Sequence, residues 1–298
     1  MYSAFFIYSG NVYCRAGSMA VQLPQYVMGI PITMTIAPFG HPHPQCIALT
    51  PQAQQLMRRV LVLMPDTRTN ARCFLGLNAN NIMVDTVTGI PYLRVVWTNY
   101  DADLARMNYT RLEEIFRETI FNEVLLATLP PDIHGLLHLM RTDGDAHSYA
   151  IQHHCSLVLA GDKITLFLRL YNYLHDILRW QDYLLYEGVV NNLYFYENWQ
   201  TIIPWIPYLA SFYIGGEYGP LFLGDPLAGG VQVLRFMRNT YSHPLQHAWN
   251  IATGQRMYGE AQLVDMMETL FPLLIHSHQL ALHIRGRLTD IPLCSLFL

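Results

Sequence analysis

A short run of residues in the last quarter of the chain carries side chains suited to chemistry on a phosphodiester. Arg238 and Asn239 are adjacent, and His243 follows Asn239 by four residues, which predicts that Asn239 and His243 share one helix face. Pro244 disfavours helical backbone at His243, so we expect this imidazole at a helix C-terminus, where the helix dipole favours its protonated form. RNA cleavage by the 2′-hydroxyl needs a proton acceptor, a proton donor for the leaving 5′-oxygen, and donors that stabilise the charged phosphorane. The run offers a donor and stabilising groups for such a reaction.

The remaining histidines predict no metal centre. The pairs His153/His154 and His276/His278 lack acidic partners at metal-ligand spacing, as do His41 and His43. We interpret them as hydrogen-bonded core residues or surface residues, and the sequence predicts no metal and no cofactor.

Composition excludes several classes of protein. Hydrophobic residues make up 52% of the 298 residues and charged residues 13%, which excludes a disordered chain. The net charge of −4 excludes a broadly basic nucleic-acid coat but leaves a local basic site open. Five widely spaced cysteines without a C-x-x-C pair indicate a reducing compartment, and with no leader-like segment or membrane span we expect a cytoplasmic protein.

The elements that must position these residues change character near residue 101. Before it, the pattern predicts one or two strands within residues 1–50, a helix capped by Thr50, and a hairpin of Ile82–Val84 with Leu93–Val96. After it, apolar spacing predicts helices alone, at 112–126, 131–140, 162–183, 231–242 and 260–288. On the helix at 231–242, Leu234, Met237 and Tyr241 occupy a face that can be buried.

Residues 73–85 resemble a protein-kinase catalytic loop that has lost its chemistry. A working loop reads H-R-D-L-K-x-x-N before a short strand, and here only Leu77, Asn81 and the strand remain. Gly76 stands at the position of the catalytic aspartate, and Trp97 at that of the D-F-G aspartate that holds Mg²⁺. Lys163 is the only lysine, so no lysine precedes it to contact the phosphates. The resemblance implies a truncated kinase-like module that does not transfer phosphate.

Residues 234–243, Leu-Arg-Phe-Met-Arg-Asn-Thr-Tyr-Ser-His, resemble the L-R-x-x-R-N-x-x-x-H signature of the kinase-extension nuclease domain. That domain follows the kinase module in the unfolded-protein-response sensor ribonuclease and in the oligoadenylate-dependent ribonuclease. Three further landmarks occur in order: a first helix from Lys163, the pair Asn198-Trp199, and the run Phe-Pro-Leu-Leu at 271–274, which matches the family's F-P-x-L-L element. The resemblance covers roughly residues 30–288 and is strongest in the last 130.

The resemblance implies metal-free cleavage that leaves a 2′,3′-cyclic phosphate. His243 would be the general acid, Arg238 would clamp the phosphate, and Asn239 would position it. The family's tyrosine base corresponds to Asp225 here, so either Asp225 itself or Tyr218 would act as the base. An acidic residue six positions before the arginine is replaced by Gln232, a neutral amide that cannot fix a charged partner as a carboxylate would.

The resulting fold prediction is a mainly α chain with an α+β N-terminal part. It comprises an N-terminal extension (1–30), a truncated pseudokinase-like C-lobe (31–157), an all-helical nuclease-extension domain (158–288) and a tail (289–298).

We expect an RNA-cleaving homodimer, because family members build a composite RNA site from two such domains. The alternative is a catalytically reduced module that regulates an active homologue by heterodimerising. Taken singly, an exposed Arg-Asn pair or a histidine before proline is commonly no more than helix surface or a cap.

Overall fold

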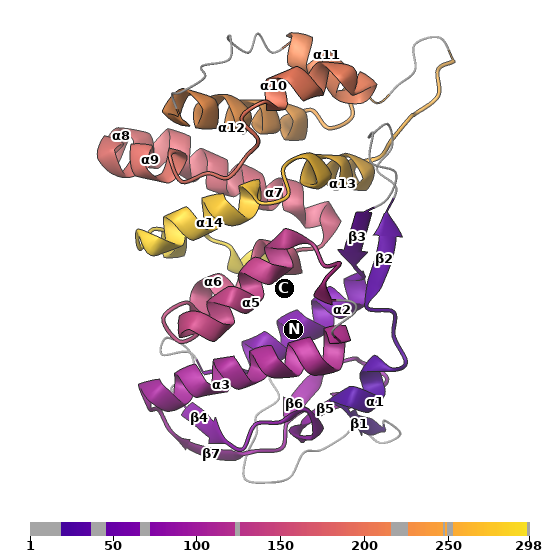
Figure 1. Cartoon of the computed structure of the whole chain (residues 1–298), viewed down its shortest axis with the longest axis vertical. Helices are drawn as coiled ribbons and strands as arrows, with labels where there is room; N and C mark the ends of the chain where they lie inside the picture. The colour runs from indigo at the N-terminus through magenta and orange to yellow at the C-terminus, as the bar shows by residue number, and fades with distance from the viewer. Residues whose placement is uncertain are drawn as a thin grey trace.

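The computed structural model describes residues 19–36, 46–65, 72–122, 126–215, 226–246, 248 and 253–296. It is 62% helix and 11% strand, so the mainly α class expected from the sequence is confirmed. The molecule is elongated, with a mixed part that holds the strands at one end and helices alone at the other (Figure 1). In the described segments, no helix is both long and apolar enough to cross a membrane.

The described strands all lie in the mixed part, as expected, and they form three small antiparallel sheets. The strands are β1 (Ala20–Gln22), β2 (Thr33–Ile36), β3 (Cys46–Leu49), β4 (Arg72–Leu75), β5 (Ile82–Asp85), β6 (Pro91–Leu93) and β7 (Val96–Asn99). β5 pairs with both β1 and β6, β2 pairs with β3, and β4 pairs with β7.

The predicted hairpin forms, but its second strand is shorter than expected. β6 ends at Leu93, and the Arg94 N–H then donates to the Asn81 carbonyl (2.8 Å) as the chain leaves this sheet. The next residues enter β7, which pairs with β4 instead. The run Leu93–Val96 therefore belongs to two sheets, which an apolar run alone could not reveal.

The mixed part also holds described helices, two of which begin at a side-chain cap. They are α1 (Leu23–Val27), α2 (Pro51–Val62), α3 (Ala102–Ile115), α5 (Pro131–Asp143) and α6 (Ser148–Gln152). The Thr50 side chain accepts the Ala53 N–H (3.2 Å) to cap α2, as predicted. α3 starts ten residues before its predicted start at Leu112, because Asp101 caps it by accepting the Leu104 N–H (2.8 Å) and its first turns are polar. It continues as wider π-type turns to Phe121.

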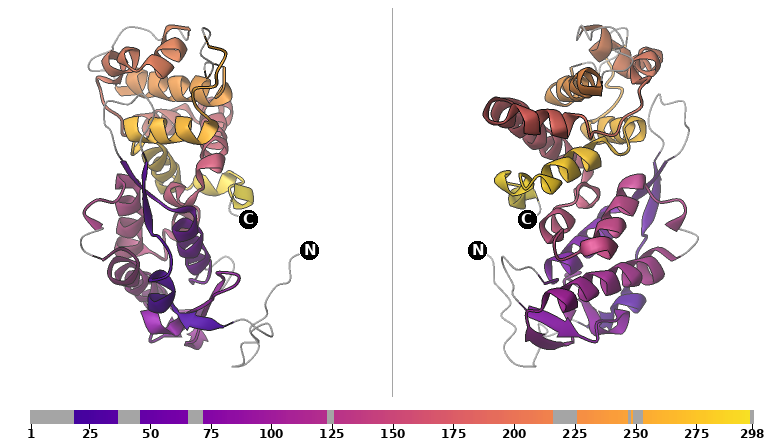
Figure 2. Two further views of the ribbon diagram at one scale, coloured as in Figure 1. Left: turned by 90° about the vertical axis from the view of Figure 1, so that its right-hand side faces the viewer. Right: turned by 60° about the vertical axis from the view of Figure 1, so that its left-hand side comes forward.

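The second part is built from helices packed in layers (Figure 2). They are α7 (Ala160–Asn172), α8 (Arg179–Gln181), α9 (Tyr183–Val190), α10 (Trp199–Ile202), α11 (Pro207–Gly215), α12 (Pro226–Ser242), α13 (Glu260–Leu270) and α14 (Leu274–Ile284). π-type turns at Tyr173–Leu178 join α7 to α8, so the predicted helix at 162–183 is nearly continuous.

One predicted helix is wrong. The pattern at 260–288 predicted a single helix, but the structure divides it into α13 and α14. The break lies at Phe271, whose backbone (φ −128°, ψ 59°) is not helical, directly before Pro272. Proline disfavours helical backbone at the residue before it, which accounts for the break. The F-P-x-L-L element therefore spans a turn rather than a helix.

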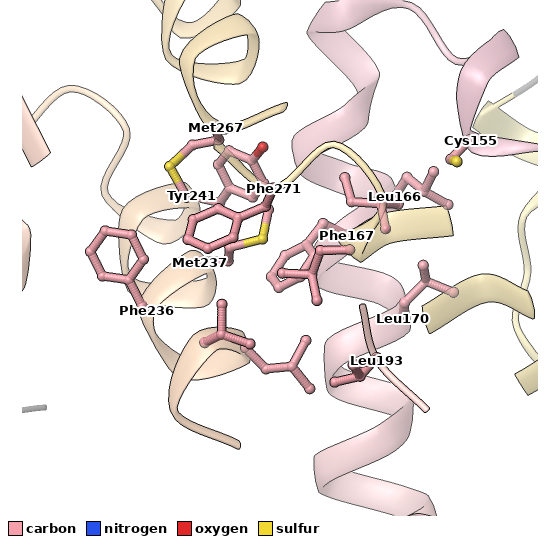
Figure 3. Packing of buried hydrophobic residues seen from close by; sticks show 14 of the residues in the cluster. Cys155, Leu166, Phe167, Leu170, Leu193, Phe236, Met237, Tyr241, Met267 and Phe271 are labelled. Atoms are coloured by element: carbon pink, nitrogen blue, oxygen red, sulfur yellow. The ribbon is translucent and has the colours of Figure 1, made fainter. Parts of the chain in front are cut away.

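Buried apolar side chains form two clusters, one for each part of the molecule. The first draws on residues 23–157 and the second on residues 150–296. In the second, Phe167 from α7 contacts Tyr241 from α12 edge to face (5.4 Å between ring centroids), and Met267 and Phe271 lie nearby (Figure 3). The segment Cys155–Leu157, between α6 and α7, contacts helices of both parts.

Candidate functional site

The helix α12 separates its core residues from its polar residues, as the sequence predicted. Leu234, Met237 and Tyr241 are buried in the second cluster. Tyr241 lies beside Phe167 of α7 and Met267 of α13 (Figure 3). Arg235 and Arg238 are exposed, and Asn239 is half-buried. The burial of the apolar face fixes the orientation of α12, and this presents the arginines to solvent.

Arg238 and Asn239 are joined by a side-chain hydrogen bond. Arg238 Nη1 donates to Asn239 Oδ1 (3.3 Å). A guanidinium has five N–H donors in a planar fork, so Arg238 can hold the neighbouring amide and still contact a phosphate. The bond fixes the amide with its oxygen toward Arg238.

His243 directly follows the last residue of α12. The helix ends at Ser242, where Pro244 predicted that it would, and the His243 imidazole is exposed. The chain then turns back, because the Gln246 N–H donates to the His243 carbonyl (3.0 Å). The structure therefore places Arg238, Asn239 and His243 on the last two turns of one helix and just beyond its end.

Two further arginines, which the sequence did not single out, act on the same tyrosine as Arg238. Burial raises the pKa of the half-buried Tyr171 hydroxyl, while Arg238, Arg235 and Arg179 act against that rise. Their charges therefore come within electrostatic reach of one tyrosine from two elements, α12 and the start of α8. We call Arg179, Arg235 and Arg238 the arginine face. The spacing of Arg235 and Arg238, one helical turn apart, was the available signal.

Aromatic side chains border the arginine face. The Arg179 guanidinium lies 5.6 Å from the ring centroid of Trp180 and 5.8 Å from that of Tyr186, which is cation–π range. The Trp180 side chain is 77% exposed. By contrast, Trp199 is buried against Phe236 (5.2 Å between centroids), so it belongs to the core rather than to a stacking surface.

The two candidate bases, Tyr218 and Asp225, lie outside the described residues. Gln232, at the position of the expected carboxylate, is on the first half of α12. Its Oε1 atom is buried and, among the described residues, has no hydrogen-bond partner. Gln232 therefore does not fix Arg238 or His243 through that oxygen.

The kinase-like loop is used for packing and for closing a turn. Trp97 faces Phe74 across the β4–β7 pair, with their rings edge to face (5.5 Å between centroids). The Asn81 amide donates to the Gly76 carbonyl (2.9 Å), and Gly76 adopts φ +70°, which favours glycine. These positions hold no carboxylate, and their contacts stabilise the loop.

His154 and His276 fit the interpretation made from the sequence, whereas His278 departs from it. His154 is buried and its Nε2 lies 2.9 Å from Nδ1 of His276, on α14. A second such pair joins His147 Nδ1 to His283 Nε2 (2.9 Å). His278 is buried with neither ring nitrogen hydrogen-bonded to a described residue, so it is neither a satisfied core histidine nor a surface one.

The lone lysine is buried between three helices. Lys163 on α7 forms an ion pair with Glu268 on α13, and Asp132 on α5 lies within electrostatic reach. Burial alone would lower the Lys163 pKa, but the two carboxylates outweigh it and hold the pKa above its usual value. This charged group links the two parts of the molecule.

Comparison with known proteins adds no family or function to these observations. No protein family, no curated protein and no solved structure matches the chain.

Proposed function

We propose that the helical part binds RNA and cleaves it without a catalytic metal, leaving a 2′,3′-cyclic phosphate. The observation that carries the proposal is the grouping on α12: exposed Arg238, its bonded neighbour Asn239, and exposed His243 at the helix end. His243 would protonate the leaving 5′-oxygen, and Arg238 would stabilise the charge on the phosphorane. Asn239 would position the phosphate.

The arginine face supports an RNA substrate. Single-stranded RNA presents one phosphate per nucleotide and an unstacked base that aromatic side chains can hold. Arg179 and Arg235 widen the cationic surface beyond Arg238. The net charge of −4 then requires that RNA binding be local to this face.

We further propose that the chain acts as a homodimer in the cytoplasm. Trp180 and Leu184 are 77% and 80% exposed, four residues apart on α8 and α9. Exposed large apolar groups of this kind are typical of interaction surfaces. The mixed part would serve as a scaffold with no phosphoryl transfer, since Gly76 and Trp97 stand where the carboxylates would be needed.

A second candidate function follows from Gln232. Among the described residues, its buried Oε1 has no hydrogen-bond partner and so does not hold Arg238 or His243. This favours a catalytically reduced module that pairs with an active homologous nuclease domain. Such a module would bind RNA or the homologue but would not cleave.

The test is incubation of concentrated purified protein with an end-labelled stem-loop RNA in EDTA. The proposal expects cleavage, with 3′ ends that resist polyadenylation until acid opens the cyclic phosphate and a phosphatase removes the resulting monophosphate. Binding without cleavage at micromolar protein would replace the enzymatic proposal with the second candidate. Cleavage that leaves free 3′-hydroxyl ends would contradict the proposed chemistry.

A further inference from the structure

We propose that His154, Cys155 and His276 form a Zn²⁺ site that fastens α14 to the segment between α6 and α7. One ligand atom from each of the three residues lies within 4.8 Å of the others. The first two residues are adjacent in sequence, and His276 comes from a distant helix, so an ion here would clamp the two parts of the molecule together. The site is separate from the residues proposed for cleavage.

The two ring nitrogens are almost at the separation that zinc imposes. His154 Nε2 and His276 Nδ1 lie 2.9 Å apart and share one proton. Two nitrogens at about 2.0–2.1 Å from a tetrahedral zinc ion lie roughly 3.3 Å apart, so the rings need to open by only about 0.4 Å. The ion takes the place of the shared proton.

The other nitrogen of His154 has a partner suited to the metal-bound state. His154 Nδ1 lies 2.8 Å from Ser156 Oγ. With Nε2 on zinc, the ring proton moves to Nδ1, which gives up the bond that it accepts from the Ser156 N–H (3.3 Å) and donates to the hydroxyl instead. Metal-bound histidines commonly donate their second N–H in this way, which fixes the ring orientation.

The third ligand is a buried thiol whose backbone is held in place. The Cys155 N–H donates to Gln279 Oε1 (3.0 Å), and the Gln279 amide donates to the His153 carbonyl. Gln279 is on α14, one turn from His276, so the same helix positions two of the ligands. On binding, zinc displaces the thiol proton to solvent and holds the thiolate.

A glycine on the neighbouring helix makes room for His276. A Cβ atom at Gly135, inside α5, would lie 2.4 Å from His276 Cε1. Glycine inside a helix costs about 1 kcal/mol relative to alanine, so its presence here calls for a reason. The reason offered by the contacts is the close approach of the His276 ring, which brings Nδ1 to His154.

The surroundings and the donor set both favour a divalent, borderline-soft ion. Asp132, Glu268 and Lys163 are within electrostatic reach of Cys155. Two carboxylates against one ammonium leave a net negative charge when all are ionised, and a thiolate adds to it. Two imidazoles and one thiolate suit zinc, with the fourth position left for a water molecule.

The experiment uses the full chain, stripped with EDTA, desalted, and titrated with Co²⁺ as a spectroscopic probe and then with Zn²⁺. The proposal expects one Co²⁺ per chain, with a thiolate-to-cobalt band in the near ultraviolet and tetrahedral bands in the visible. Zn²⁺ should displace Co²⁺ and raise the melting temperature. Cys155→Ser should abolish the thiolate band, and His276→Gln should weaken binding at least tenfold.

Matched variants control for general effects. His283→Gln removes a member of the other histidine pair, and Cys73→Ser removes another buried free thiol. Both should bind Co²⁺ as the wild type does. The proposal is overturned if the wild type shows no thiolate band at one equivalent, an outcome that does not depend on whether any variant folds. It is also overturned if folded Cys155→Ser and His276→Gln proteins bind as tightly as the wild type.

Discussion

Arg238 is exposed and bonded to its neighbour Asn239, so it can meet a phosphate without first being drawn out of the core. Its position depends on the buried residues of the same helix, Leu234 and Met237, and no carboxylate of a described residue forms an ion pair with it. Because position 232 holds a glutamine and not an acidic residue, it does not neutralise the charge of the Arg238 guanidinium, which stays available to a ligand. This arrangement favours binding of an anion over a purely structural ion pair.

At the residue scale, Arg238→Ala should weaken RNA binding and also slow cleavage. A hydrogen bond to a charged group contributes about 1.5–3 kcal/mol, so we expect a roughly ten- to hundredfold loss of affinity and a further loss of rate. Filter binding and single-turnover cleavage measure the two effects. Arg94→Ala, at an exposed arginine of the mixed part, is the control and should change neither.

His175 gives a pH prediction, because burial, and then Arg179, lower its pKa from 6.5 to about 4. Between these two values the unfolded chain binds more protons than the folded chain. The stability contributed by neutral His175 is therefore fully present above pH 6.5 and is lost as the pH falls toward 4. Tyr171, Tyr186 and the buried His278 also face this ring.

The variant His175→Phe isolates this contribution from those of the other histidines. Its loss of unfolding free energy between pH 7.5 and 4.5 should be smaller than that of the wild type by about 2 kcal/mol. Urea unfolding at the two pH values measures it. An equal loss in both proteins would show that His175 does not titrate in this range.

At the element scale, the ion pair between α7 and α13 should be a strong link. Lys163→Met leaves Glu268 and Asp132 without their cation, and removing one partner of a buried pair commonly costs 3–5 kcal/mol. The Glu268 side chain is 32% exposed and can regain water, so we expect about 3 kcal/mol. Denaturant unfolding checks this, and Lys163→Met with Glu268→Gln should recover part of the loss. A double variant less stable than the single one would contradict the account.

The sequence predicted elements where a local signal decides them. Thr50 and Pro51 marked the start of α2, and the spacing of Leu234, Met237 and Tyr241 identified the buried face of α12. The start of α3 was missed because a polar first turn carries no apolar period. The break at Phe271 was missed although Pro272 was the available signal.

The candidate site was predictable to the extent that its residues are close in sequence. Arg238, Asn239 and His243 lie on one stretch of helix, so their spacing was enough to group them. Arg179 and Arg238 are 59 residues apart in sequence but act on the same tyrosine. His154 pairs with His276, which follows it by 122 residues. Only tertiary packing brings such residues together, and no local pattern records it.

At the scale of the whole molecule, we expect self-association through α8 and α9 and a cleavage rate that rises faster than linearly with protein concentration. The double variant Trp180→Ala, Leu184→Ser should sediment as a monomer and lose this upward curvature. Val87→Ser with Val96→Ser changes exposed apolar residues of the mixed part and serves as the control. Sedimentation at several concentrations, with initial rates on the same samples, is the measurement. A monomeric wild type with a strictly linear rate would contradict the dimer.

The central claim, that His243 acts as a general acid in RNA cleavage, is tested most directly by single-turnover cleavage of one labelled RNA by three proteins. These are the wild type, His243→Gln, and His134→Gln, which changes another exposed histidine. Loss of general acid catalysis predicts that His243→Gln cleaves at least about a hundredfold more slowly with RNA affinity nearly unchanged, while His134→Gln matches the wild type. Equal rates for the wild type and His243→Gln would contradict the claim.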